Sequence, residues 1–252
     1  MKRIKLTVAY DGTRYSGWQL QPNAETIESV LNRHLSGLLK EEITVTGASR
    51  TDAGVHSLGN VAVFDTNTRI PVEKISYAMN TRLPEDIVIQ DSCEVEPDFH
   101  PRRTDSRKTY EYRILNRKFP LPDCRHNTYF VHRNLDVEKM SQAAEYLRGE
   151  HDFKSFCSVH AQVQSTVRTV YGICVEKEND IVTIRITGNG FLYNMVRIIA
   201  GTLLQVGIGC LRPEEIETIL EKKDRRAAGP TAPAHGLTMI GIEYLQNGFC
   251  KF

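Results

Sequence analysis

The sequence predicts an α+β protein made of two halves, each with the order strand, helix, strand, strand, helix, strand. Two observations support this prediction: apolar residues alternate with polar ones along several short runs, and they recur at helical spacing in the segments between these runs. Size and composition agree with it. The chain has 252 residues, of which 25% are charged and 40% hydrophobic, as in ordinary globular proteins of one large or two small domains.

The first half is expected to occupy residues 1–104. Strands are predicted at residues 3–10, 43–48, 60–64 and 87–95, because apolar and β-branched residues follow strand periodicity there. Helices are predicted at 26–40, where aliphatic residues recur at helical spacing, and from Pro71 to about Arg82, since proline favours the first helical position. The connector 49–57 is polar and contains glycine, which predicts a loop.

The second half is expected to occupy residues 105–252 and to repeat the order with insertions. Strands are predicted at 108–115, 166–176, 181–187 and 239–245, and helices at 136–148, capped by Asp136, at 191–206, and from Pro213. Two such units correspond to RRM-like or ferredoxin-like halves, with antiparallel sheets that carry helices on one face. We expect a central active-site cleft where the two halves meet.

Charge and targeting signals narrow the class of protein. The formal net charge of +1 excludes a strongly basic nucleic-acid coat, so a polyanion would have to bind to local patches. Residues 1–10 lack the apolar core and cleavage site of a signal peptide, and the apolar stretch 191–206 is interrupted by polar residues, as in a buried helix. The six cysteines form no Cys-x-x-Cys pair. We expect reduced core thiols in a cytoplasmic protein that has no membrane segment.

Motifs of common cofactor and metal enzymes are missing from the sequence. The run Gly188-Asn189-Gly190 lacks the third glycine of a dinucleotide site, because Tyr193 stands there. The sequence contains no nucleoside-triphosphate loop, no paired histidine or cysteine metal motif and no Gly-x-Ser-x-Gly nucleophile elbow. The histidines in or beside predicted loops, including His160, are interpreted as surface or core residues. We therefore expect no metal, no nucleotide and no other cofactor.

A block of basic residues at the junction of the halves could bind phosphates. Its members are Arg102, Arg103, Arg107, Lys108, Arg113, Arg117 and Lys118. Tyr110 and Tyr112 alternate with some of them, and aromatic side chains next to cations are typical of surfaces that bind single-stranded RNA. A solvated edge strand explains the same pattern. A second, weaker candidate cluster contains Lys222, Lys223, Arg225 and Arg226.

The loop Arg50-Thr51-Asp52-Ala53-Gly54-Val55-His56 is the strongest candidate for chemistry. Asp52 before Ala53-Gly54 could simply cap a turn, with Arg50 as a solvated neighbour. Alternatively, an ionised carboxylate near an arginine could serve as a nucleophile or as the electrostatic partner of an electron-deficient carbon. Residue types alone leave both interpretations open.

Five collinear segments together resemble the motifs of the bacterial tRNA pseudouridine synthase A family. They are YDGTRYSGWQ (10–19), RTDAGVH (50–56), KTYEYRI (108–114), residues 191–201 with Met195-Val196-Arg197, and AGPTAPAHGL (228–237). The resemblance spans essentially the whole chain. One departure is Ser49, where that family more often has glycine.

This resemblance implies that uridine is converted to pseudouridine at anticodon-stem positions 38 to 40 of transfer RNA, by a homodimer without a cofactor. In the family pattern Asp52 matches the nucleophilic aspartate, Tyr110 the tyrosine that stacks on the base, and Arg197 the arginine that pairs with the aspartate. Arg50 is expected to contact the substrate, and Arg102, Arg103, Arg107 and Lys108 are expected to contact RNA. Attack of Asp52 at C1′, attack at uracil C6 and removal of the C2′ proton all remain open. A non-catalytic RNA-binding protein with two RRM-like units is the alternative, although the sequence lacks the aromatic RNP signature.

Overall fold

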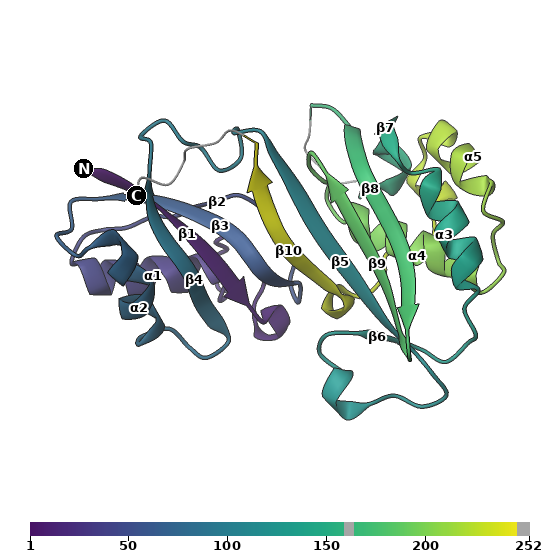
Figure 1. Cartoon of the computed structure of the whole chain (residues 1–252), viewed down its shortest axis with the longest axis horizontal. Coiled ribbons are helices and arrows are strands. Elements are labelled where there is room, and N and C mark those ends of the chain that lie inside the picture. Colours follow the sequence, from purple (N-terminus) through teal and green to yellow (C-terminus); the bar gives the residue numbers. More distant parts are fainter. Residues whose placement is uncertain (159–163, 246–252) are drawn as a thin grey trace. The chain divides into compact units, whose positions relative to one another are not determined.

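The computed structural model describes residues 1–158 and 164–245, and the chain divides into two compact units (Figure 1). Unit 1 contains Met1–Ser106 together with the residues from Met239 onward, and unit 2 contains Arg107–Thr238. The division after Ser106 lies two residues from the predicted end of the first half. The prediction that all of 105–252 forms the second half is corrected, because the residues from Met239 onward belong to unit 1.

The sheet of unit 1 has the strand order β4-β1-β3-β10, and a short strand, β2, pairs with β3 (Figure 1). The pairs β1–β3, β1–β4 and β2–β3 are antiparallel. The strands are β1 (Lys2–Tyr10), β2 (Thr46–Gly47), β3 (His56–Thr66), β4 (Ile87–Val95) and β10 (Leu237–Tyr244). The sequence predicted a six-residue second strand, but only two residues pair with β3.

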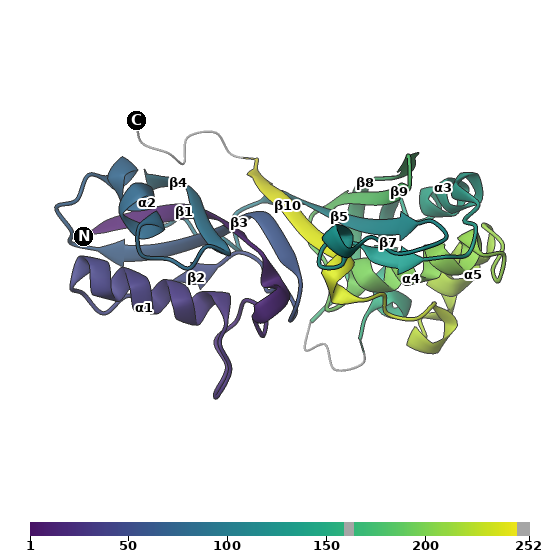
Figure 2. The same cartoon turned by 90° about the horizontal axis from the view of Figure 1, so that it is seen from below.

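The helices of unit 1 are α1 (Ile27–Leu39) and α2 (Val72–Asn80) (Figure 2). Thr26 begins α1 with a reciprocal capping box, in which its hydroxyl accepts from the Ser29 backbone and the Ser29 hydroxyl accepts from the Thr26 backbone. The apolar sides of both helices share one core with alternate residues of β1, including Leu6, which is fully buried. Both helices therefore cover the same face of the sheet, as the sequence predicted.

The sheet of unit 2 has the strand order β5-β9-β8-β7, and the neighbouring pairs β5–β9, β8–β9 and β7–β8 are antiparallel. These strands are β5 (Ser106–Asn116), β7 (Gly149–Asp152), β8 (Val167–Glu178) and β9 (Ile181–Gly188). A further short strand, β6 (Tyr129–Val131), pairs with β5 in parallel, which departs from the purely antiparallel prediction. The sequence prediction missed β6 and β7, because three or four residues are too few to show strand periodicity.

The helices of unit 2 are α3 (Val137–Glu145), α4 (Met195–Gly207) and α5 (Glu215–Lys222). Asp136 caps α3 as predicted, by accepting from the Lys139 backbone N–H at 3.0 Å. Helix α4 begins later than predicted because Asn194 takes the left-handed conformation, with φ of 62°. All residues of α4 except Arg197 and Gln205 are buried. Within the described residues no helix combines the length and apolar character needed to cross a membrane.

The prediction of six reduced core cysteines is wrong in two respects. Cys93 is disulfide-bonded. Cys157 is buried and free, but Cys174 and Cys210 are exposed free thiols. Cys174 is exposed because it lies at an outward position of β8, where buried and exposed residues alternate. Cys250 lies outside the described residues.

Candidate active site

The loop between β2 and β3 presents Asp52 in a tight turn of unit 1. The backbone N–H of Val55 donates to the backbone carbonyl of Asp52 at 3.1 Å, and Gly54 takes the left-handed conformation with φ of 79°. Asp52 is half-buried, whereas its neighbour Thr51 is only 7% exposed. The backbone around Asp52 is thus enclosed by protein while the residue itself retains access to solvent.

The last residue of β1 and the segment between β1 and α1 hold the backbone on both sides of Asp52. Before Asp52, the Thr51 hydroxyl shares a hydrogen bond with the Tyr10 hydroxyl at 2.7 Å, and the Thr51 carbonyl accepts from the Trp18 N–H at 3.0 Å. After Asp52, the Gly54 N–H donates to the Tyr15 carbonyl at 3.3 Å. Because these hydrogen bonds flank Asp52, they fix the position from which its side chain projects.

Two glycines of that segment allow it to lie directly against the Asp52 loop. At Gly17, where φ is 87°, a Cβ atom would lie 2.6 Å from the Thr51 carbonyl oxygen. At Gly12 a Cβ atom would overlap the carbonyl oxygen of Val55. The backbones approach more closely than any other residue type would allow.

Gly17→Ala is expected to destabilise the protein by about 1–3 kcal/mol and to lower turnover, because both the positive φ and the closeness of Thr51 oppose a side chain. Gly37→Ala is the matched control, since Gly37 lies in α1 with nothing near its missing Cβ atom. That variant should be neutral or more stable. Thermal unfolding and turnover on tRNA measure both effects; equal stability of the two variants would contradict this packing role of Gly17.

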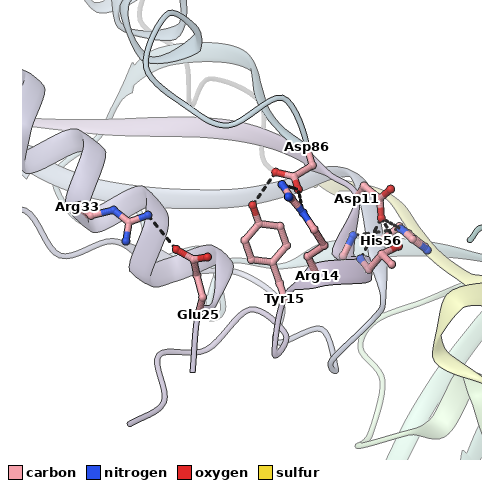
Figure 3. A network of polar contacts seen from close by, with 9 residues as sticks. Asp11, Arg14, Tyr15, Glu25, Arg33, His56 and Asp86 are labelled. Atoms are coloured by element: carbon pink, nitrogen blue, oxygen red, sulfur yellow. Dashed lines mark hydrogen bonds and ion pairs between the residues drawn. The ribbon is translucent and has the colours of Figure 1, made fainter. Parts of the chain in front are cut away.

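A polar network ties the same segment to the rest of unit 1 (Figure 3). The Gly12 N–H donates to His56 Nδ1 at 3.1 Å, and this nitrogen lies 3.1 Å from Asp11 Oδ1. Tyr15 and Arg14 both donate to the carboxylate of Asp86. His56, interpreted from the sequence as a surface or core residue, is 7% exposed and joins the end of the Asp52 loop to the residues after β1.

Arg197 lies in the first turn of α4 in unit 2 and is attached to the segment that follows α5. Its Nε donates to the Ala232 carbonyl at 2.8 Å, and one terminal nitrogen donates to Asn194 Oδ1 at 2.8 Å. The Ala232 N–H donates in return to the Arg197 carbonyl at 3.1 Å. Gly201 brings this segment against α4, because a Cβ atom there would overlap the Pro230 carbonyl oxygen. Two of the family-like segments, 191–201 and 228–237, therefore form one packed structure.

Tyr110 lies on β5 opposite Ile186 of β9 and is 8% exposed. Its ring meets the Phe191 ring edge to face, with centroids 5.2 Å apart and an angle of 80° between the ring planes. Phe191 also lies against Gly188, where a Cβ atom would come within 3.2 Å of the Phe191 ring. The glycine at the end of β9 thus leaves room for the ring that orients Tyr110.

The basic residues predicted to contact RNA differ in their surroundings within the protein. Arg102 donates from Nε to the Gly47 carbonyl at 2.7 Å, and burial together with the charge of Arg50 lowers the pKa of its guanidinium. Arg103 is exposed. The Arg107 guanidinium lies 5.2 Å from the centre of the Tyr171 ring. Arg102 therefore supports the strand that leads into the Asp52 loop and, with Arg50, places two positive charges near each other.

The second basic cluster is largely occupied by internal hydrogen bonds and ion pairs. Arg225 donates to the Gly229 carbonyl and to the Thr231 hydroxyl, at 2.9 and 3.1 Å. Arg226 pairs with Asp224 at 2.7 Å, and Lys223 pairs with Asp152 at 2.9 Å. These interactions favour a structural role for the cluster.

Across residues 1–158 and 164–245, no group of three or more His, Cys, Asp or Glu side chains could hold a metal ion. His160, one of the loop histidines considered above, lies outside these residues.

The sequence interpretation missed Tyr15, Trp18 and Asp86 as supports of the Asp52 loop. The available signal was the presence of Gly12 and Gly17 in this segment, because glycine is the residue type that lets a chain approach another backbone closely. Nothing in the local sequence shows which backbone that is.

Comparison with known proteins decides the identity. A family model described as tRNA pseudouridine synthase matches residues 6–102 and 143–244. The chain belongs to the tRNA pseudouridine synthase family. It is 49% identical over 244 residues to tRNA pseudouridine synthase A of Acetivibrio thermocellus, a match that covers 97% of this chain and 100% of the relative. The corresponding protein of Ruminiclostridium cellulolyticum is 50% identical over 245 residues, with the same two coverages.

As a member of the tRNA pseudouridine synthase family the protein is an isomerase that converts uridine in transfer RNA to pseudouridine. The resemblance seen in the sequence is confirmed. Family membership also favours the isomerase over the alternative of a non-catalytic RNA-binding protein.

Proposed function

We propose that this tRNA pseudouridine synthase acts on uridines 38, 39 and 40 of the anticodon stem-loop, with Asp52 as the reacting carboxylate. The observation that supports this role is the fixed backbone around Asp52, held on both sides by hydrogen bonds between its neighbours and residues 10–18. A carboxylate used in covalent or electrostatic catalysis must be held in position, because small displacements reduce the rate strongly.

The proposed reaction is redox-neutral, so it needs no hydride or electron carrier. The glycosidic bond between C1′ and N1 breaks, the uracil turns, and a new bond forms between C1′ and C5. The proton on C5 is released to solvent, and N1 takes up a proton from solvent. A carboxylate at position 52 can stabilise or bond to the carbon that becomes electron-deficient. Attack at C1′, attack at C6 and removal of the C2′ proton all use the same group.

The other proposed roles follow the chemistry of each side chain. Tyr110 provides an aromatic surface for the base, oriented by Phe191. Arg197 provides the cation that accompanies the aspartate in the family pattern, and its orientation is fixed by Asn194 and Ala232. Arg50, an exposed cation two residues before Asp52, is proposed to contact the substrate.

The site of modification is tested with an unmodified tRNA transcript whose uridines carry tritium at C5. Release of tritium and mapping of pseudouridine at positions 38 to 40 are expected. A matched transcript with cytidine at these three positions should release none. Release from the control transcript would contradict the assignment of positions, and binding without any release would favour the non-catalytic alternative.

Arg103, Arg107 and Lys108 are proposed to contact phosphates, with Arg102 supporting the Asp52 loop as well. Replacing Arg103 and Arg107 with alanine should reduce the slope of log affinity against log salt by about 0.7–0.9 for each phosphate that is no longer neutralised, because fewer counterions are released. Thermal stability should change little, since neither side chain is buried. Filter binding across a salt series measures the slope.

Arg226→Ala is the matched control for this measurement, because Arg226 is also exposed but is paired with Asp224. We expect it to leave the slope unchanged. An unaltered slope in the Arg103 and Arg107 variant would show that the basic block is a solvated edge.

A homodimer in the cytoplasm is part of the same proposal. A tRNA stem-loop carries many phosphates, and two subunits would offer more cations than a chain of net charge +1 provides alone. Sedimentation of the purified protein should give twice the mass of one chain; a monomeric mass that retains full activity would contradict the dimer.

A further inference from the structure

We propose that the carboxylate of Asp86 is a positioning group for Asp52, acting through Tyr15. This inference rests on the proposed function of Asp52 and extends it to a residue 34 positions further along the chain, in the turn before β4. Figure 3 shows Asp86 above Tyr15 and Arg14, with both side chains directed toward its carboxylate.

Asp86 accepts hydrogen bonds from three residues of the segment after β1. The Tyr15 hydroxyl donates to Oδ1 at 2.6 Å and Arg14 Nε donates to Oδ2 at 2.9 Å. The Asp86 backbone carbonyl accepts from the Asp11 N–H at 2.9 Å. Only 13% of the Asp86 side chain is exposed, although the Arg14 side chain is 68% exposed, so the bond from the enclosed Tyr15 is the better shielded of the two side-chain bonds. The segment is therefore fastened to the start of β4.

Tyr15 connects this anchor to the Asp52 loop. Its ring is enclosed, with 5% of the residue exposed, and its backbone carbonyl accepts from the N–H of Gly54. Burial, followed by the hydrogen bond to Asp86, raises the pKa of the Tyr15 hydroxyl above its usual value. The hydroxyl thus stays protonated at neutral pH and remains a donor to Asp86.

The path from Asp86 to Asp52 consists of two hydrogen bonds and the rigid Tyr15 residue between them. If the bond between Tyr15 and Asp86 is removed, the ring can shift and the Tyr15 carbonyl loses its fixed position relative to Gly54. The turn that carries Asp52 then has greater freedom, while the tRNA-binding cations are unaffected. A positioning role predicts a fall in kcat with little change in KM, because only the geometry of the reacting group changes.

The test uses Tyr15→Phe, Asp86→Asn and the double variant in the full-length enzyme, with tritium release from tRNA as the assay. Tyr15→Phe keeps the ring and the Asp86–Arg14 pair, so the variant should fold. We expect kcat to fall about tenfold or more in each single variant, with KM for tRNA nearly constant. The double variant should be no slower than the slower single variant, because Tyr15→Phe removes the donor and Asp86→Asn removes the charge of the acceptor in the same hydrogen bond.

Asp65→Asn is the matched control. Asp65 accepts from Arg3 at 2.8 and 2.7 Å between β1 and β3 of the same unit, at the opposite end of β3 from the Asp52 loop. The variant should lower thermal stability and leave kcat unchanged. If Tyr15→Phe and Asp86→Asn behave like this control, the inference is overturned while inactive Asp52→Asn still supports the proposed function. Full turnover by Asp52→Asn would instead overturn the role of Asp52 and this inference with it.

Discussion

Replacing Asp52 with asparagine is expected to abolish pseudouridine formation while the fold and tRNA affinity stay nearly intact. The amide has the same shape but no negative charge to offer the reaction centre, and removal of a nucleophile typically costs about 10⁴-fold or more in kcat. The fold should survive because the hydrogen bonds that hold this turn are made by Tyr10, Trp18 and Tyr15 with the neighbours of Asp52. Tritium release, filter binding and thermal unfolding measure the three properties.

Two further measurements accompany this expectation. Asp65→Asn repeats the chemical change elsewhere in unit 1 and should remain active. A tRNA with deuterium at the ribose C2′ position should react more slowly only if the C2′ proton leaves in the slow step. Substantial turnover by Asp52→Asn would remove Asp52 from the mechanism.

Arg197→Ala is expected to have the second largest effect, a fall in kcat of about 10²-fold. The substitution removes a positive charge and leaves the Ala232 carbonyl and Asn194 Oδ1 without the donors that Arg197 supplies. The lost charge and the greater freedom of the segment around Ala232 then both lower kcat. Arg197→Lys restores the charge but lacks the forked guanidinium, so it should recover only part of the rate. Single-turnover measurements separate the chemical step from binding.

Gln205→Ala provides the comparison for Arg197→Ala. Gln205 is the other residue of α4 that is not buried, and it lies about two turns further along the same helix. We expect it to retain normal turnover. Equal rates in the two alanine variants would show that Arg197 serves only the stability of α4.

The sequence by itself determined those elements whose signals are local. Helix α1 follows from the apolar spacing over residues 26–40, and the structure begins the helix at Ile27. The segment around Asp52 was predicted to be a loop between two strands, because most of its residues are polar and one of them is glycine. The order of family motifs also pointed to the tRNA pseudouridine synthase family, which the full-length matches confirm.

Other features were decided only by tertiary structure, because they depend on partners far away in the chain. The residues of β10 from Met239 onward belong to unit 1, where β10 pairs with β3, and β6 is a strand only because β5 lies beside it. Asn194 delays the start of α4 by taking a left-handed conformation that apolar periodicity does not show.

The residues that hold the candidate site in place also divide into those that the sequence indicates and those that only the tertiary structure reveals. The sequence singled out Asp52, but Tyr15 and Asp86 are separated by 71 positions, and no local pattern pairs a hydroxyl with a carboxylate over that distance. Arg102 was predicted as a phosphate ligand, and only the tertiary structure shows that its Nε also donates to the Gly47 carbonyl, 55 positions away. Local sequence determines which groups are present and which segments are helical or extended. The tertiary fold decides which of these groups meet, because hydrogen bonds depend on distance in space and not on distance along the chain.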